Sequence, residues 1–477
     1  MQNETKKTHT EEKWYDRYVK KAEKAKAKAK SINERREENK KRNEYFSEKR
    51  KNPGKFQNTQ TESPIPSRPN ATLVSKENMF DFSYLPEDAV KVLENFDTIV
   101  QDVRPLNTRQ LENLPSDIRE LSRQLTDERH TRRMGYMNST EELSAYIRYF
   151  MWWNLVRFTR VFASQNESDF DLQDGDYCLD LGSGPLTVVI ALWLSRPELR
   201  NKRLTFYCVD LSLSTLSLGE DIYLSVASRT PPSDERANPT WNIIRIKGSV
   251  GVPLKNKASF ISAANMFNEI RESAQQRPVD LADEHIKTLL NYATEKASIF
   301  IAEPGMPVAA YFVSLMRIRF LQNKFTAFSP CTHEKRCPMS GLHARYGGSA
   351  KWCNFSFQTK DAPKRLLQLS KDAGLPKERA VISFVFAGRG RKPKLQKTEK
   401  IAKKEMDSKE LVLRIASDPF WLPGNRQGFY ACSAMGLVLL VNLSHARISS
   451  GERVAVILDS KDPLPRDVKS KAGIIVI

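Results

Sequence analysis

The segment CLDLGSGP, Cys178–Pro185, decides the fold. Apolar residues precede and follow it, which is the strand–turn–helix setting that a nucleotide-binding loop requires. Gly182 and Gly184 allow the backbone to turn tightly and to approach a ligand where a Cβ atom would clash. Asp180 ends the apolar run, where a carboxylate can position the charged amino-acid part of a ligand. The segment therefore predicts a nucleotide-type cofactor beyond the end of a strand.

Short apolar runs alternate with helical stretches on either side of this segment. The strands expected are 176–181, 204–210, 241–246, 258–264 and 297–303, and the helices expected are 186–194 and 308–324. Such alternation predicts an α/β fold built on a parallel, doubly wound sheet. Asp210 ends the second expected strand, where a carboxylate can accept both hydroxyls of a ribose, which favours S-adenosylmethionine (SAM) or NAD.

The glycine loop followed by a distal Asp resembles the class I SAM-dependent methyltransferases. The resemblance implies a Rossmann-like sheet and SAM as cofactor. The cofactor-binding residues are then expected to be Asp180, Gly182, Ser183, Gly184, Asp210 and Ser249. Leu186 stands where a third glycine is usual, which would hold the helix further from the ligand. A scaffold that no longer binds SAM is the alternative, because a fold does not fix a function. No catalytic residue is assigned.

Four cysteines in the C-terminal half form the second notable pattern: Cys331, Cys337, Cys353 and Cys432. Clustered thiols in a chain without a secretory signal indicate metal or cluster ligands rather than disulfides. Structural zinc usually uses closer cysteine pairs, so the wide spacing favours an iron–sulfur cluster. Zinc and unligated buried thiols remain the alternatives. His333 and His343 could each replace a thiolate, whereas Cys178 and Cys208 are expected to be core residues.

The charge balance favours a polyanionic partner. The chain of 477 residues has 76 Lys+Arg against 57 Asp+Glu, a formal net charge of +19. An excess of this size is typical of proteins that bind nucleic acid or a ribonucleoprotein. Residues 1–70 alone contain 20 Lys+Arg and 11 Asp+Glu, and residues 388–410 form another charged run. A soluble protein with a basic tail is the alternative.

The sequence contains no apolar run long enough for a transmembrane helix, so no membrane association is expected. The N-terminal residues lack the apolar core of a signal peptide. Their acidic residues, Glu4, Glu11 and Glu12, argue against a mitochondrial transit peptide. A cytoplasmic monomer is therefore expected, with the mitochondrial matrix as the alternative location.

Four regions are expected along the chain. They are a disordered or partly helical basic arm (1–75), a helical region (80–168), a SAM-methyltransferase-like domain (170–325) and a cysteine-cluster extension with a small β-rich unit (326–477). One helix of the second region is expected to open at 113–116, and another at Ser139, where Glu142 completes a capping-box pattern. Strands are expected at 382–387, 411–415, 436–441 and 452–458.

Several segments between about residues 100 and 445 resemble a known family. They are LPSDIRELSRQLTDER, SAYIRYFMWWNLVRF, CLDLGSGP, IFIAEPGMPVAAYFVSLMRIRF and KWCNFSF. The sequence is similar to mitochondrial and bacterial small-ribosomal-subunit assembly proteins of the methyltransferase-like protein seventeen type. The resemblance implies a [4Fe–4S] cluster on Cys331, Cys337, Cys353 and Cys432, with SAM near Gly182, Gly184 and Asp210. It also implies the small ribosomal subunit and its rRNA as partners.

Three functional hypotheses follow. The leading one is an RNA-binding assembly factor of the small ribosomal subunit, with a SAM-binding fold and an iron–sulfur cluster in a structural role. The second is an active SAM-dependent rRNA methyltransferase. The third is a zinc-stabilised RNA-binding module without SAM. Radical SAM chemistry is not expected, because the C-x₃-C-x₂-C spacing is missing.

Overall fold

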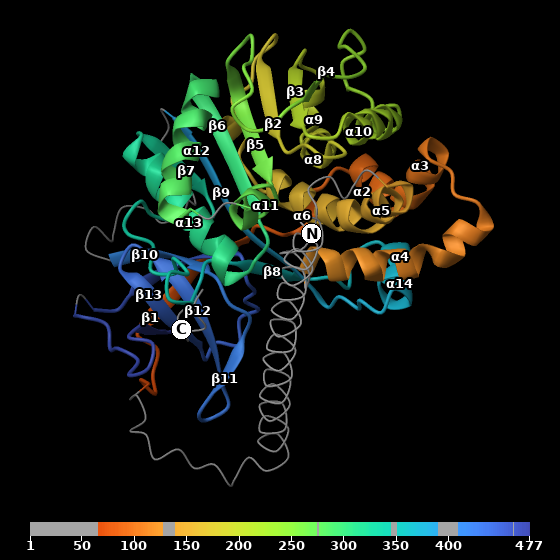
Figure 1. Ribbon diagram of the computed structural model, residues 1–477. Coiled ribbons are helices and arrows are strands. Elements are labelled where there is room, and N and C mark those ends of the chain that lie inside the picture. Colours follow the sequence, from red (N-terminus) through yellow and green to blue (C-terminus); the bar gives the residue numbers. More distant parts are fainter. Residues whose placement is uncertain (1–64, 127–138, 274–275, 345–350, 390–408, 461) are drawn as a thin grey trace, which may run out of the picture. The chain divides into compact units, whose positions relative to one another are not determined.

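The computed structural model describes residues 65–126, 139–273, 276–344, 351–389, 409–460 and 462–477, all within the unit Ser63–Ile477 (Figure 1). Most of the basic arm and of the charged run 388–410 lies outside these residues. No helix among the described residues is long and apolar enough to cross a membrane.

An eight-stranded mixed sheet lies at the centre of the α/β part, so the predicted α/β class is confirmed, whereas the sheet predicted to be parallel also contains antiparallel pairs. Its order is β4-β3-β2-β5-β6-β9-β7, with β8 paired to β9. Its strands are β2 (Tyr177–Leu181), β3 (Thr205–Asp210), β4 (Asn242–Lys247), β5 (Ala258–Ala264), β6 (Ala293–Glu303), β7 (Phe325–Ser329), β8 (Phe355–Gln358) and β9 (Arg379–Arg389). Strands β2 to β6 run parallel, and β9 lies antiparallel between β6 and β7.

Helices cover both faces of this sheet (Figure 1). They are α8 (Thr187–Ser195), α9 (Pro197–Arg200), α10 (Leu213–Ala227), α11 (Phe267–Ser273), α12 (Pro278–Tyr292) and α13 (Pro307–Gln322). Helix α14 (Lys364–Asp372) lies instead beside the N-terminal helices. Cys178 and Cys208 lie, fully buried, in the core that includes α8 and α10. Leu179 and Val209 lie in the opposite core, with α12 and α13. Because both faces are buried, the strands read as apolar runs, and Cys178 and Cys208 are core residues as predicted.

The N-terminal helices pack against the first of these cores. They are η2 (Phe82–Tyr84), α2 (Glu87–Glu94), α3 (Phe96–Val103), α4 (Thr108–Thr126), α5 (Thr140–Ala145), the π-helix η4 (Tyr146–Met151), α6 (Trp152–Ala163) and α7 (Glu167–Phe170). The Ser139 hydroxyl caps α5 as predicted, accepting a hydrogen bond from the Glu142 amide at 3.1 Å. The predicted helix start at 113–116 is wrong, because Pro115 lies inside α4. Asn107 and Gln110 form the actual capping pair.

A second sheet has seven strands in the order β1-β14-β10-β12-β13-β15, with β11 paired to β12. Its strands are β1 (Ala71–Asn78), β10 (Lys409–Ile415), β11 (Phe420–Leu422), β12 (Arg426–Ser433), β13 (Gly436–Asn442), β14 (Glu452–Leu458) and β15 (Gly473–Val476). β1 pairs antiparallel with β14, with Ala71 opposite Leu458. Residues 71–75, assigned from sequence to the basic arm, therefore belong to the C-terminal sheet.

Candidate functional site

The chain order of the central sheet reverses between β2 and β5. The connections that leave these two neighbouring parallel strands lead toward opposite edges of the sheet. In open α/β sheets, ligands usually bind at such a reversal, beyond the carboxyl ends of the strands. The glycine loop follows β2 there, and Asn265 and Met266 follow β5. The predicted cofactor residues thus come to the edge where a ligand is expected.

The two loop glycines have different surroundings. Both have positive φ angles, +64° at Gly182 and +50° at Gly184, which glycine adopts most readily. A Cβ atom on Gly182 would lie 2.8 Å from Cγ of Met266, so this side chain already occupies the space above Gly182. A Cβ atom on Gly184 would meet no described atom within 4 Å. The backbone at Gly184 is therefore the more open approach for a ligand.

Asp210 fastens the glycine loop to the neighbouring strand. Its carboxylate accepts hydrogen bonds from the amides of Gly184 and Ser212, both at 3.0 Å. The Ser183 hydroxyl donates to the Asp180 carbonyl at 2.8 Å, which closes the turn. Ser249 is exposed in the segment that follows β4, so it comes to the same edge. Asp210, predicted to bind a ribose, thus also holds the glycine loop in place through these hydrogen bonds.

Asp180 lies beneath the loop and is only 1 % exposed. One carboxyl oxygen accepts a hydrogen bond from the Ser262 hydroxyl at 2.6 Å, and the other has no partner among the described residues. Burial raises the pKa of Asp180 to about 7, although the Ser262 hydrogen bond opposes the rise. Asp180 is therefore protonated in the folded protein below neutral pH.

Leu186 and Gly219 together replace the third glycine of the motif. Leu186 is fully buried with a left-handed backbone, φ +58°, and directly precedes α8. Gly219, on α10, allows the two segments to touch, because a Cβ atom there would lie 2.5 Å from the Pro185 carbonyl carbon. Sequence reasoning missed Gly219. The only signal is a glycine inside an otherwise apolar helix, which indicates close packing.

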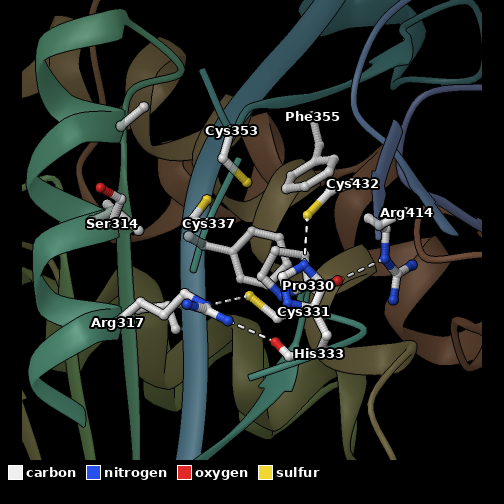
Figure 2. Close-up of a pocket in the computed structure, with 14 residues that line it drawn as sticks. Ser314, Arg317, Pro330, Cys331, His333, Cys337, Cys353, Phe355, Arg414 and Cys432 are labelled. Atoms are coloured by element: carbon white, nitrogen blue, oxygen red, sulfur yellow. Dashed lines mark hydrogen bonds between the residues drawn. The ribbon is translucent and has the colours of Figure 1, made fainter. Parts of the chain in front are cut away.

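The four predicted cysteines line one pocket, together with Arg317, His333 and Arg414. Cys331 and Cys337 follow β7, Cys353 precedes β8, and Cys432 lies on β12 of the second sheet. Figure 2 shows their sulfur atoms around a shared space. All four thiols are free. The pocket volume is about 30 Å³, enough space for at least one water molecule or ion.

Local pairing explains how the cysteine segment folds back. Ser340 and Trp352 form an isolated antiparallel bridge, and the Cys353 amide donates to the Met339 carbonyl at 2.8 Å. Gly341, with φ +79°, directly follows the bridge residue Ser340, and a Cβ atom there would lie 2.9 Å from the Pro307 carbonyl oxygen. The fold-back brings Cys353 toward the part of the chain that carries Cys337.

Burial controls the protonation of the pocket. It raises the pKa of Cys337 to about 11, and the charge of Cys331 adds to the rise. It also raises the pKa of Cys353 and Cys432, with neighbouring cysteines contributing. Burial lowers the pKa of His333 to about 4, and its Nε2 atom lies 3.1 Å from Sγ of Cys432. These three thiols and His333 are therefore neutral at pH 7 in the absence of a metal.

Two buried arginines were not predicted as part of this site. Arg317 donates from Nε to Sγ of Cys331 at 3.0 Å (Figure 2). Arg414 donates from Nε to the Pro330 carbonyl at 2.8 Å. Burial lowers the pKa of Arg414 to about 10; for Arg317 the cysteines outweigh burial and raise the pKa. His343, proposed from sequence as a substitute ligand, is exposed and is not among the residues that line the pocket.

Within the described residues, no group of three or more His, Cys, Asp or Glu side chains is arranged to hold a metal ion. The predicted metal-binding character of the C-terminal extension consequently remains a proposal.

Comparison with known proteins identifies the family. The sequence profile described as "Mitochondrial small ribosomal subunit Rsm22" matches residues 144–422, more than half of the chain. The chain belongs to the Rsm22 family. This agrees with the resemblance to small-subunit assembly proteins. No curated protein matches the chain.

Among solved structures, similar chains include two methyltransferases from Geobacter species. A precorrin-6y C5,15-methyltransferase from Geobacter metallireducens is 10 % identical, with a TM-score of 0.27, and the match covers 54 % of this chain and 92 % of that one. A SAM-dependent methyltransferase from Geobacter sulfurreducens, solved with S-adenosyl-L-homocysteine, is 12 % identical with the same TM-score, covering 50 % and 90 %. At such low scores, the fold of the Rsm22-family chain rests on its own strand order.

Proposed function

We propose that the protein is an RNA-binding assembly factor of the small ribosomal subunit, with a [4Fe–4S] cluster on Cys331, Cys337, Cys353 and Cys432. The observation that carries the proposal is the meeting of four free thiols from separate segments around one pocket. Four thiolates are the usual ligand set of such a cluster, so the donor chemistry fits. Membership of the Rsm22 family and the net charge of +19 support the ribosomal partner and its rRNA.

The wide sequence spacing of the cysteines favours a cluster over zinc. Structural zinc usually uses closer cysteine pairs, because a short turn aims two thiolates at one tetrahedral ion. A cluster of several metal and sulfide atoms is a larger group and suits wider spacing. When bound, the cluster would supply a rigid cross-link. Because Cys432 lies on β12 and the other three cysteines lie between β7 and β8, that link would join the two sheets.

Metal analysis tests this proposal. Protein purified without oxygen should contain about four irons and four acid-labile sulfides per chain, with the visible absorption of a cluster. A single zinc and no sulfide would reject the cluster. That result would favour the alternative of a zinc-stabilised RNA-binding module without SAM.

We further propose that SAM binds at the strand-order reversal, against Gly184 and Asp210. The open space at Gly184 supports this placement. The same open space favours the second candidate function, an active SAM-dependent rRNA methyltransferase. No residue of the described chain is assigned to catalysis. Calorimetric titration with SAM, on wild type and on Asp210→Ala, tests the binding. If Asp210→Ala loses SAM but still supports ribosome assembly, methyl transfer is not the main task.

RNA binding is tested through its dependence on salt. Each phosphate contact that is neutralised releases counterions, so binding weakens steeply with salt concentration. Deletion of residues 1–60 should reduce that slope if the basic arm contacts phosphate. The family description favours the mitochondrial matrix over the cytoplasm for this protein, which we propose acts there as a monomer. Cell fractionation and light scattering check these two points.

A further inference from the structure

Two buried arginines line the cysteine pocket without an acidic partner. Arg317, on α13, is 4 % exposed, and Arg414, on β10, is 8 % exposed. Buried charges in proteins are normally paired, because moving an ion out of water costs several kcal/mol. Among the described residues, no carboxylate forms an ion pair with either guanidinium.

The hydrogen bonds of these arginines go to main-chain carbonyls and to one thiol, not to carboxylates. Arg317 donates from Nη2 to the carbonyls of His333 and Lys335, at 2.6 and 3.1 Å. Arg414 also donates from Nη1 to the Gly451 carbonyl at 2.7 Å. Carbonyl groups are dipoles without net charge, and the remaining acceptor of Arg317 is the Cys331 sulfur, so no carboxylate balances either positive charge at the pocket wall.

The charged groups that act on Arg414 from the second sheet do not change this balance. They are Arg453 and Glu77, which form an ion pair with each other at 3.2 Å. Three other buried arginines of the described residues do have acidic partners. Those pairs are Arg160–Asp361, Arg196–Glu198 and Arg200–Asp88. Arg148, 3 % exposed, is also without a carboxylate ion pair among the described residues, so the cysteine pocket is distinguished by having two such arginines in one wall.

We propose that Arg317 and Arg414 are the counter-charges of an anionic metal–thiolate group, so that loading of the pocket controls the stability of this region. The inference rests on the proposed function, which places a metal group on the four cysteines. Four thiolates around a dipositive zinc ion or cluster core leave a net charge of about −2, which two guanidinium groups balance. Without that group the two cations stay buried and unpaired. The arginines then favour the loaded form and penalise the empty one.

The test compares Arg317→Met in its loaded form and after anaerobic removal of metal by a chelator. The hydrogen bonds to His333 and Lys335 are lost in both forms, so their loss cancels in the comparison. We expect the loaded variant to melt at a lower temperature than loaded wild type, and to lose metal to chelator about tenfold faster. The emptied variant should melt at or above the temperature of emptied wild type.

Two further variants separate charge from packing. Arg196→Met is the matched control, because Arg196 also donates to main-chain carbonyls but has Glu198 as a permanent partner. It should lower the melting temperature equally in both forms. Arg317→Lys keeps the charge and should retain most of the slow metal loss. If emptied wild type is already unfolded, the rate of metal loss from the three loaded variants decides.

Equal destabilisation of loaded and emptied Arg317→Met overturns the inference, because the arginine would then serve packing alone. Metal loss from Arg317→Lys as fast as from Arg317→Met also overturns it. Metal analysis of wild type judges the proposed function separately. Zinc in place of iron, with the expected contrast in Arg317→Met, rejects the cluster and supports the counter-charge role. A chain that binds neither metal overturns both.

Discussion

The glycine-loop edge and the cysteine pocket differ in how far each is complete without a ligand. At the edge, Asp210 accepts hydrogen bonds from the loop amides and Asp180 accepts one from Ser262. At the pocket, three neutral thiols surround a cavity whose wall contains two arginines without acids. The edge forms most of its hydrogen bonds within the chain, apart from one oxygen of Asp180, whereas the pocket keeps two buried charges that a ligand can balance.

The two sites also differ in the range of sequence that builds them. The loop residues from Asp180 to Gly184 are contiguous, and Asp210 is on the next strand. The pocket requires Cys331 and Cys432 to meet across two sheets. We therefore expect ligand loss to unfold the surroundings of the pocket and to leave the edge intact. This contrast gives the predictions below their order.

Cys432→Ser should have the largest effect. We expect it to abolish iron binding and to loosen the second sheet from the first, at a cost of roughly 3 kcal/mol or more, because metal binding and folding are coupled. Iron content and hydrogen exchange of β12 and β10 measure the two effects. Cys178→Ala is the control: it removes a buried thiol of the central core and should keep full iron. Normal iron content in Cys432→Ser would remove this cysteine from the ligand set.

Gly219→Ala should destabilise the edge. A methyl group at this position would lie 2.5 Å from the Pro185 main chain, so α10 or the loop must move. Overpacking of this kind costs about 1–3 kcal/mol, and the shifted loop should bind SAM more weakly. Urea unfolding and calorimetric titration measure both effects. Ser217→Ala, on the same helix, should change stability by only a few tenths of a kcal/mol. An unchanged Gly219→Ala would mean that the close contact has no energetic consequence.

Gly184→Ala should separate binding from folding. The new Cβ atom meets no described neighbour, so the cost is limited to about 1 kcal/mol for the left-handed backbone. We expect SAM affinity to fall by about tenfold or more, because the methyl group would occupy the open approach to the loop. Iron content should not change, since the pocket is built from other segments. Unchanged SAM affinity would place the cofactor elsewhere along the sheet edge.

Local patterns allowed much of the central sheet to be predicted. Strand β5 has the predicted bounds, Ala258–Ala264, because an isolated apolar run between polar turns leaves little ambiguity. The start of α4 was missed because Pro115 suggested an opening, while the Asn107–Gln110 pair was overlooked. The α8 prediction, 186–194, differs by one residue at each end from Thr187–Ser195.

Long-range contacts could not be predicted from local patterns. Strand β1 pairs with β14, which follows it by several hundred residues. The sequence of β1, ATLVSKEN, does not indicate which strand it pairs with. Cys432 was included in the predicted ligand set, but its distance in sequence from the other three cysteines could not place it near them. Arg317 was visible as a charge inside an apolar helix, yet its contact with Cys331 depends on how the segment after β7 folds back. That Arg317 is buried without an acidic partner can be recognised only from the three-dimensional structure.

The last prediction concerns how Asp180 titrates. Its pKa is raised from 3.8 to about 7 in the folded protein, so between about pH 4 and pH 7 the folded state holds a proton that the unfolded state has released. Stability from this group is thus fully present below about pH 4 and is lost as the pH rises through 7. Relative to Asp180→Asn, the unfolding free energy of wild type should fall by at most about 1.4 kcal/mol per pH unit within that range.

Urea unfolding of the two proteins across this pH range checks the Asp180 prediction. Other titrating groups, including the pocket thiols, contribute equally to both proteins and cancel in the difference. The amide introduced by Asp180→Asn keeps an acceptor for the Ser262 hydroxyl and cannot ionise, so the difference reports the single proton. If the two pH profiles run parallel, Asp180 is ionised in the folded protein. The edge would then carry an unbalanced buried charge as the cysteine pocket does, and the cationic amino group of SAM would be its natural partner.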